Sequence, residues 1–141
     1  MIVRFGAGGT SDDERALRRV RKFCLSLPET SETDSWGHPN FRAGKRTFVT
    51  YEWIRGIPTI AFRLSPAEVR KRQQTRGFLP TPYGRGQWVS MEAHARLDWR
   101  LVEALILKSY RQVAIARMVR ALEKRPRKAR ASPSNNRWRG P

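Results

Sequence analysis

Residues 40–64 read NFRAGKRTFVTYEWIRGIPTIAFRL, and this stretch decides the fold class. Its first fourteen residues are typical of a β-hairpin that turns at Ala43-Gly44-Lys45. After a second turn at Arg55-Gly56, IPTIAFRL continues as another strand. Three strands in series, joined by tight turns, indicate an antiparallel sheet. The core candidates on the hairpin are Phe41, Phe48 and Tyr51, and the next strand carries Ile57, Ile60 and Phe62.

Helical patterns lie on both sides of these strands. A capping box of Ser11 with Glu14 begins a helix whose apolar residues recur at helical spacing until Pro28 stops it. A short helix begins at the cap residue Ser65, and one long helix is expected from about Asp98 to Lys124. Helix, strands, short helix, strands and long helix indicate an α+β fold, with the terminal helices packed on one face of the sheet.

The segment 81–89, TPYGRGQWV, lies between two further extended pieces. Glycine tolerates positive φ, so we interpret the segment as a hairpin-like connection that uses Gly84 and Gly86 in this way. Arg85 then projects from the tip, where a side chain beside open backbone suits phosphate contact.

The 141 residues suit one domain. We expect a flexible N-terminus at 1–10, a folded domain at 11–124, and a basic, disordered tail at 125–141 that has little to bury. The single cysteine, Cys24, excludes an internal disulfide and is expected to be buried. No metal-ligand spacing, cofactor motif, signal peptide or membrane span is apparent, which predicts a cytoplasmic protein without a metal or cofactor.

Charge gives the strongest functional indication. Lys and Arg total 29 against 12 Asp and Glu, a formal charge of +17. Arginine keeps its charge and forks onto phosphate oxygens, so the composition predicts a polyanionic partner, with nucleic acid as the first hypothesis. The proposed contacts are Arg18, Arg19, Lys22, Lys45, Arg46, Arg63, Arg76, Arg85, Arg117, Arg120, Lys124, Arg125, Arg127, Lys128 and Arg130.

Aromatic residues support a second hypothesis. Rings can stack on bases or line a pocket near the Trp36-Gly37-His38-Pro39 turn, whereas in a small domain they also fill the core. The candidates are Trp36, His38, Tyr83, Trp88, Tyr110 and Trp138. Among them Trp88 and Tyr110 are expected in the core, and Trp138 has no core to join.

Several pieces occur together, in order: FCLSLPETSETDSWGHPNFRAGKRTFV, RLSPAE, RGFLPTPYGRGQWV and LKSYRQVA. This succession resembles the MmcQ/YjbR family, although Arg63 stands where that family often has lysine. The resemblance implies a frataxin-like (CyaY-like) fold and a DNA-binding role. Frataxin-type iron binding does not carry over, because it needs an acidic first helix and this one reads RALRRVRK.

These observations together predict a monomeric protein that binds nucleic acid through phosphate contacts, with weak sequence preference and no catalysis. Two alternatives stay open. One is a protein-interaction or small-ligand module with its pocket near the WGHP turn. The other is an enzyme that uses that pocket.

Overall fold

The computed structural model describes residues 11–94 and 96–125. These form four helices and one six-stranded sheet, and the α+β fold is as the sequence predicts. The predicted flexible N-terminus, Trp138 and all of the predicted tail except Arg125 lie outside the described residues. In chain order the elements are α1 (Ser11–Leu25), β2 (Thr30–Ser35), β3 (His38–Ala43), β4 (Arg46–Ile54), β5 (Ile57–Arg63), α2 (Pro66–Gln73), β6 (Phe78–Pro80), β7 (Trp88–Glu92), α3 (Trp99–Val113) and α4 (Ala116–Glu123).

The sheet is antiparallel throughout, in the order β2-β3-β4-β5-β7-β6. Tight turns with left-handed backbone join the first four strands. Trp36 and Gly37 have φ of 57° and 82°, and Arg55 and Gly56 have φ of 53° and 81°. Two successive left-handed residues match the twist of the flanking strands, which explains the glycine in each pair.

A β-bulge adjusts the middle of the sheet. Phe41 pairs with Val49 and Arg42 pairs with Thr47, so Phe48 has no partner on β3. Both Phe48 and Val49 are fully buried. The bulge therefore turns two adjacent side chains of β4 toward the helices, where strict alternation would bury one.

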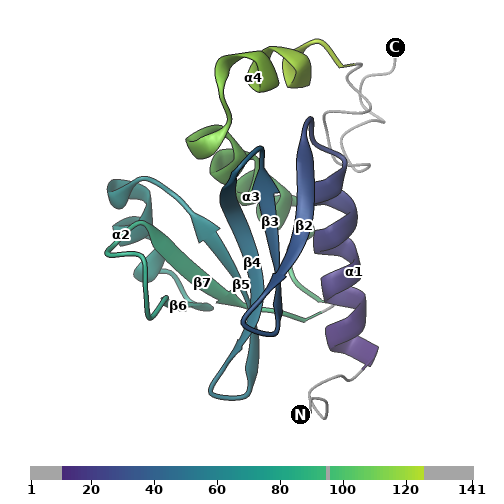
Figure 1. Cartoon of the computed structure of the whole chain (residues 1–141). Helices are drawn as coiled ribbons and strands as arrows, with labels where there is room; N and C mark the ends of the chain where they lie inside the picture. Colours follow the sequence, from purple (N-terminus) through teal and green to yellow (C-terminus); the bar gives the residue numbers. More distant parts are fainter. Residues whose placement is uncertain (1–10, 95, 126–141) are drawn as a thin grey trace.

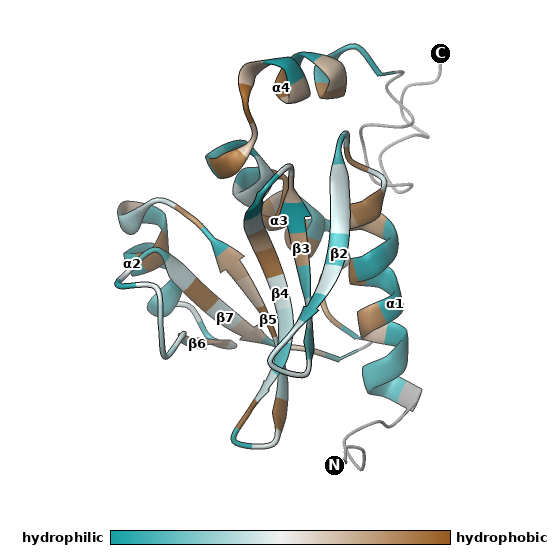
Figure 2. Cartoon of the chain, viewed as in Figure 1, coloured by the Kyte–Doolittle hydropathy of each residue, from teal (hydrophilic) through white to brown (hydrophobic). Residues whose placement is uncertain are grey.

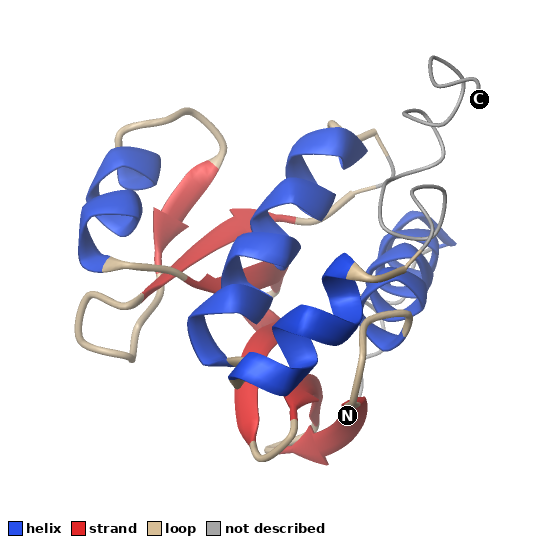
Figure 3. Ribbon diagram, turned by 90° about the horizontal axis from the view of Figure 1, so that it is seen from above, coloured by secondary structure: helices blue, strands red, loops and turns tan. Residues whose placement is uncertain are grey.

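Helices α1 and α3 cover one face of the sheet. Figure 1 shows α3 behind the strands, and Figure 3 shows the long helices together on one side of them. The Tyr51 hydroxyl donates to the Asp13 carbonyl (3.2 Å), and the Tyr110 hydroxyl donates to the Pro28 carbonyl (2.7 Å). Cys24 lies fully buried in this core as predicted, and burial raises the pKa of its thiol.

The single long C-terminal helix was a wrong prediction. The backbone becomes extended at Ala114 (ψ 138°) and Ile115 (ψ 167°), so α3 and α4 are separate helices. After the break, Met118 and Leu122 are buried in the main core, and Met118 lies close to Gly44 in the β3–β4 turn. Helical propensity favours continuation, but burying these two side chains at the end of the sheet overrides it.

The predicted turn at residues 36–39 was partly wrong as well. Only Trp36 and Gly37 form the turn, whereas His38 and Pro39 are the first residues of β3. Because His38 pairs with Ser35 across β2 and β3, its side chain belongs to a sheet face. The short helix was predicted correctly, with the Ser65 hydroxyl accepting from the Glu68 amide.

Candidate functional site

The outward side of α1 is cationic. Arg15, Arg18, Arg19 and Lys22 are exposed, and none of them forms an ion pair with another described residue. Their neighbour Arg21 instead binds Glu32 on β2 through two hydrogen bonds of 2.7 and 2.9 Å. Most of α1 is hydrophilic in Figure 2. The four cations span about 10 Å along the helix, a length that faces several phosphates of one DNA strand.

Helix α3 extends this charged side. The Arg19 guanidinium lies 4.6 Å from the centre of the Trp99 ring at the start of α3, so the two helices are neighbours. Exposed cations recur along α3 at Arg100, Lys108 and Arg111, although Lys108 is paired with Glu68 and Arg111 with Glu123, both at 3.3 Å. We call these seven residues of α1 and α3 the helix face. Long exposed cationic side chains of this kind can displace ions from a phosphate backbone.

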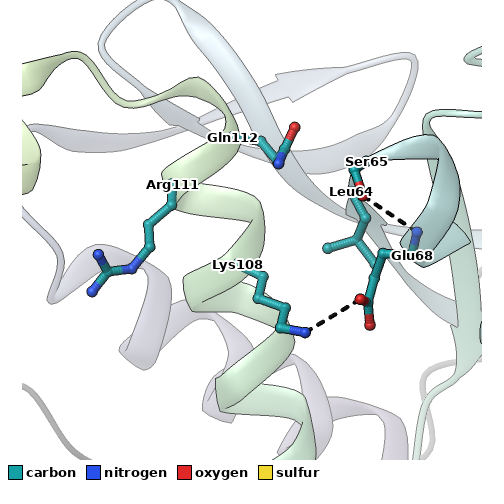
Figure 4. Close-up of a pocket in the computed structure, with 6 residues that line it drawn as sticks. All are labelled: Leu64, Ser65, Glu68, Lys108, Arg111 and Gln112. Atoms are coloured by element: carbon teal, nitrogen blue, oxygen red, sulfur yellow. Dashed lines mark hydrogen bonds and ion pairs between the residues drawn. The ribbon is translucent and has the colours of Figure 1, made fainter.

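A pocket of about 190 Å³ lies between α2 and α3. In Figure 4 the Lys108 ammonium reaches the Glu68 carboxylate, 3.3 Å away, whereas Arg111 points away from the pocket. Burial alone would raise the pKa of Glu68, but hydrogen bonds from Arg72 and Lys108 outweigh it and lower the pKa. A carboxylate held in its charged form makes this pocket unfavourable for a phosphate. The lining residues are Leu64, Ser65, Glu68, Lys108, Arg111 and Gln112.

The other predicted phosphate contacts are dispersed. Exposed cations lie in or beside turns at Lys45, Arg46, Arg76 and Arg85, and on or beside α4 at Arg120 and Lys124. Two further side chains have internal partners: Arg117 binds Glu29 through two hydrogen bonds (2.8 and 2.7 Å), and Arg125 donates to the Ser26 carbonyl (2.7 Å). Arg127, Lys128 and Arg130 lie outside the described residues.

The segment 81–87, called the flap below, connects β6 to β7 as predicted. Gly84 and Gly86 have φ of 87° and 83°, and Arg85 between them is also left-handed, at 48°. The Leu64 amide donates to the Gln87 carbonyl (2.9 Å), which fixes the end of the flap to the end of β5. The exposed Arg85 side chain stands at its tip, as expected, and phosphate contact there stays a prediction.

Of the predicted aromatic candidates, the structure brings three together. His38, Tyr83 and Trp88 lie on the sheet face opposite the helices, which we call the open face because no described helix covers it in Figure 1. Tyr110 lies on the other side, fully buried and packed edge-on against Phe48. Trp36 is 96% exposed at its turn and therefore fills no part of the core.

A polar cluster occupies the centre of the open face. His38 Nε2 lies 3.3 Å from Glu52 Oε1, and the Tyr83 hydroxyl donates to Glu52 Oε2. The same hydroxyl lies 3.3 Å from Thr50 Oγ1. Burial and this carboxylate raise the pKa of Tyr83, because both disfavour the phenolate. His38 Nδ1 is buried and has no hydrogen-bond partner among the described residues.

Sequence reasoning missed Glu52 and its neighbours. The signal was present in FVTYEW at 48–53, where Thr50 and Glu52 alternate with three large rings and a valine. A carboxylate in an otherwise apolar central strand is unusual and needs partners when buried. The other small buried residues of the open face are Asn40, Thr59, Ala61 and Ser90.

The fold and this arrangement define a class: small α+β proteins with an antiparallel sheet, helices on one face and a polar open face on the other. The YjbR family model matches residues 25–112, and the chain belongs to that family. The predicted family resemblance is thus confirmed. No curated protein matches the chain.

Solved structures of other proteins share the fold. A Deinococcus radiodurans protein, DR2400, superposes with a TM-score of 0.63 at 16% identity, over 77% of this chain and 88% of that one. A Pseudomonas syringae protein superposes with a TM-score of 0.59 at 13% identity, over 67% and 96% respectively. At these identities the likeness concerns the fold alone.

Membrane-spanning helices and groups of metal ligands are both absent from the described residues. None of the described helices is long and apolar enough to cross a bilayer. The described His, Cys, Asp and Glu residues form no group of three that could hold a metal ion.

Proposed function

We propose that this protein binds nucleic acid, DNA in preference to RNA, through the helix face, and that it acts by binding rather than by catalysis. The observation that carries the proposal is the set of four exposed cations on α1 without acidic partners among the described residues.

The helix face suits phosphates better than base edges. It offers seven arginine and lysine side chains, and the one exposed amide beside them on the described part of α3 is Gln112. Groups of this composition mostly contact phosphates, which position a protein on DNA without reading its sequence. Contacts of this kind replace condensed counterions, so affinity depends on salt and little on sequence. The turn cations and the basic C-terminal residues Arg127, Lys128 and Arg130 are proposed as secondary contacts.

Charge-matched variants test the proposal. The helix set, Arg15→Gln with Arg18→Gln and Lys22→Gln, removes three cations from α1. The turn set, Arg46→Gln with Arg55→Asn and Arg76→Gln, removes three from turns, and asparagine tolerates the left-handed backbone of Arg55. The slope of log affinity against log salt is negative, and each cation that no longer contacts a phosphate should bring it closer to zero by about 0.9.

We expect the helix set to reduce that slope by about 2.7 for duplex DNA and to weaken all duplex sequences equally. The turn set should change it by less than half as much. Equal reductions in the two sets would contradict a specific helix face, because affinity would then follow net charge alone. Weakening at one DNA sequence and not at others would contradict phosphate contact.

The alternative of a protein-interaction or small-ligand module near the WGHP turn has an observation of its own, the buried cluster in which His38 meets Glu52. It is a different site from the helix face.

A further inference from the structure

The floor of the open face is chemically unusual for a sheet surface without a helix over it. Thr59, Ala61 and Ser90 are fully buried there, and Thr50 and Glu52 are 4% and 8% exposed. The flap covers these residues together with the rings of Tyr83 and Trp88. Tyr83 extends from the flap over β7 and β5, and its hydroxyl donates to Glu52 on β4. The protein therefore keeps polar groups under a cover made by one short loop.

The cover itself is partly solvated. Tyr83 is 42% exposed, and its ring meets Trp88 edge-on with the centroids 5.9 Å apart. Its hydroxyl donates a hydrogen bond to the Glu52 carboxylate, which is itself nearly buried. A planar ring that carries a hydrogen-bond donor thus already occupies the place above Glu52, and it belongs to a loop outside the regular strands.

We propose that the open face binds one nucleotide, with its base above Glu52 in the place that Tyr83 now fills. An N–H donor of the base replaces the Tyr83 hydroxyl as the partner of Glu52, so the carboxylate keeps the same number of hydrogen bonds. The inference deepens the proposed function by naming a second site and its ligand class. The inference depends on the proposed function for one point alone, that the ligand is a nucleotide, either free or within a strand.

Glu52 predicts which base is preferred. A carboxylate only accepts hydrogen bonds, and its two oxygens offer about four lone-pair sites. Guanine alone among the common bases presents two adjacent N–H donors on its Watson–Crick edge. Glu52 can accept both of them and keep its contact with His38, whose unpartnered Nδ1 is a further polar group at the same place.

Cations stand where the phosphate would lie. Thr59, Ala61 and Arg63 share the open face because side chains alternate along β5, and Ala61 pairs with Thr50. Arg63 is therefore about 7 Å along the strand from the level of Thr50. Its Nη2 donates to the Gln87 side chain (3.1 Å), at the end of the flap, and it has no acidic partner among the described residues.

Arg85 adds a second cation at the tip of the same flap. A nucleotide whose base lies over Thr50 and Glu52 then carries its phosphate toward Arg63 and the flap. A base in the place of the Tyr83 ring would meet the Trp88 indole edge-on, as Tyr83 does now, and aromatic contacts of this kind help proteins hold unpaired bases.

Titration of the full chain with GMP, AMP, CMP and UMP, followed by backbone amide NMR, tests this directly. GMP should shift the amides of β4, β5 and the flap, and it should bind at least about fivefold more tightly than the other three, the value of one added hydrogen bond. A single-stranded oligo(dT) with one central dG distinguishes a nucleotide in a strand from a free one. Saturable guanine-dependent shifts with either probe support the site, and their absence with both overturns it.

Three variants sharpen the result. Glu52→Gln should lower GMP affinity to that of the other nucleotides, and an unchanged preference would overturn the role of Glu52. Tyr83→Phe should bind GMP more tightly, by about threefold to tenfold, because it removes the competing hydroxyl. Arg63→Gln should weaken GMP and leave guanosine unchanged, which keeps the proposal testable if Glu52→Gln does not fold.

The helix set supplies the control for the two proposals. It should lose duplex binding and retain GMP binding. If duplex binding does not depend on the helix face but GMP still shifts the open face, the proposed function fails and this inference stands. If the duplex results hold and neither guanine probe binds at the open face, only this inference fails.

Discussion

Replacing Gly84 by alanine should destabilise the protein strongly, because two separate costs meet there. The residue has φ of +87°, and a Cβ built on it would lie 2.1 Å from Cδ1 of the Trp88 indole. That ring is 8% exposed and packed between the flap and the sheet, so it cannot move aside without uncovering the open face.

The magnitude follows from both terms. A Cβ in the left-handed region costs about 1–2 kcal/mol, and overpacking a filled site costs about 1–3 kcal/mol. Gly84→Ala should therefore lower the free energy of unfolding by about 2–5 kcal/mol. For a domain of this size that corresponds to a decrease in Tm of about 8–20 °C.

Gly86 provides the matched control. Its φ of +83° is nearly the same, but a Cβ there would meet no heavy atom within 4 Å. Gly86→Ala should cost only the backbone term, about 1–2 kcal/mol. Urea unfolding of both variants, followed by circular dichroism, measures the difference. Equal destabilisation within about 0.5 kcal/mol would refute the packing of Trp88 against the flap.

Three more predictions concern the core and the helix layer. Tyr110→Phe removes the hydrogen bond to the Pro28 carbonyl and should cost about 0.5–1.5 kcal/mol in urea unfolding, and unchanged stability would contradict that bond. Cys24 should resist iodoacetamide at pH 8 in the folded protein and react in urea, since burial raises its thiol pKa; equal labelling rates by mass spectrometry would contradict its burial. The lowered pKa of Glu68 stabilises the fold above about pH 4.5, and this is lost as the pH falls through the folded pKa. Glu68→Gln should therefore be less stable than the parent at pH 7 and equal to it in strong acid, as thermal unfolding against pH can show.

The sequence predicted the elements well where local rules agreed with packing. The strands from residue 40 to 63, the Ser65 cap and the glycines of the flap all follow from periodicity and turn chemistry. The break after Val113 did not, because no proline or glycine marks it. It depends on where Met118 finds a place to bury, which is a property of the assembled fold.

The candidate sites divide in the same way. The cations of α1 could be predicted as exposed because helical spacing places them opposite the apolar residues Val20 and Cys24. The polar cluster could not, since it joins His38, Glu52 and Tyr83 from three segments that only the sheet order brings together. His38, which the sequence placed in a turn, belongs to this polar cluster because the register of β2 and β3 makes it a strand residue.

The most direct test of the central claim is the salt dependence of duplex DNA binding by the unaltered protein. If about six cations of the folded body contact phosphates, log affinity should fall against log salt with a slope near −5, at the same value for unrelated duplex sequences. A slope near zero, or no binding at low salt, would contradict the account.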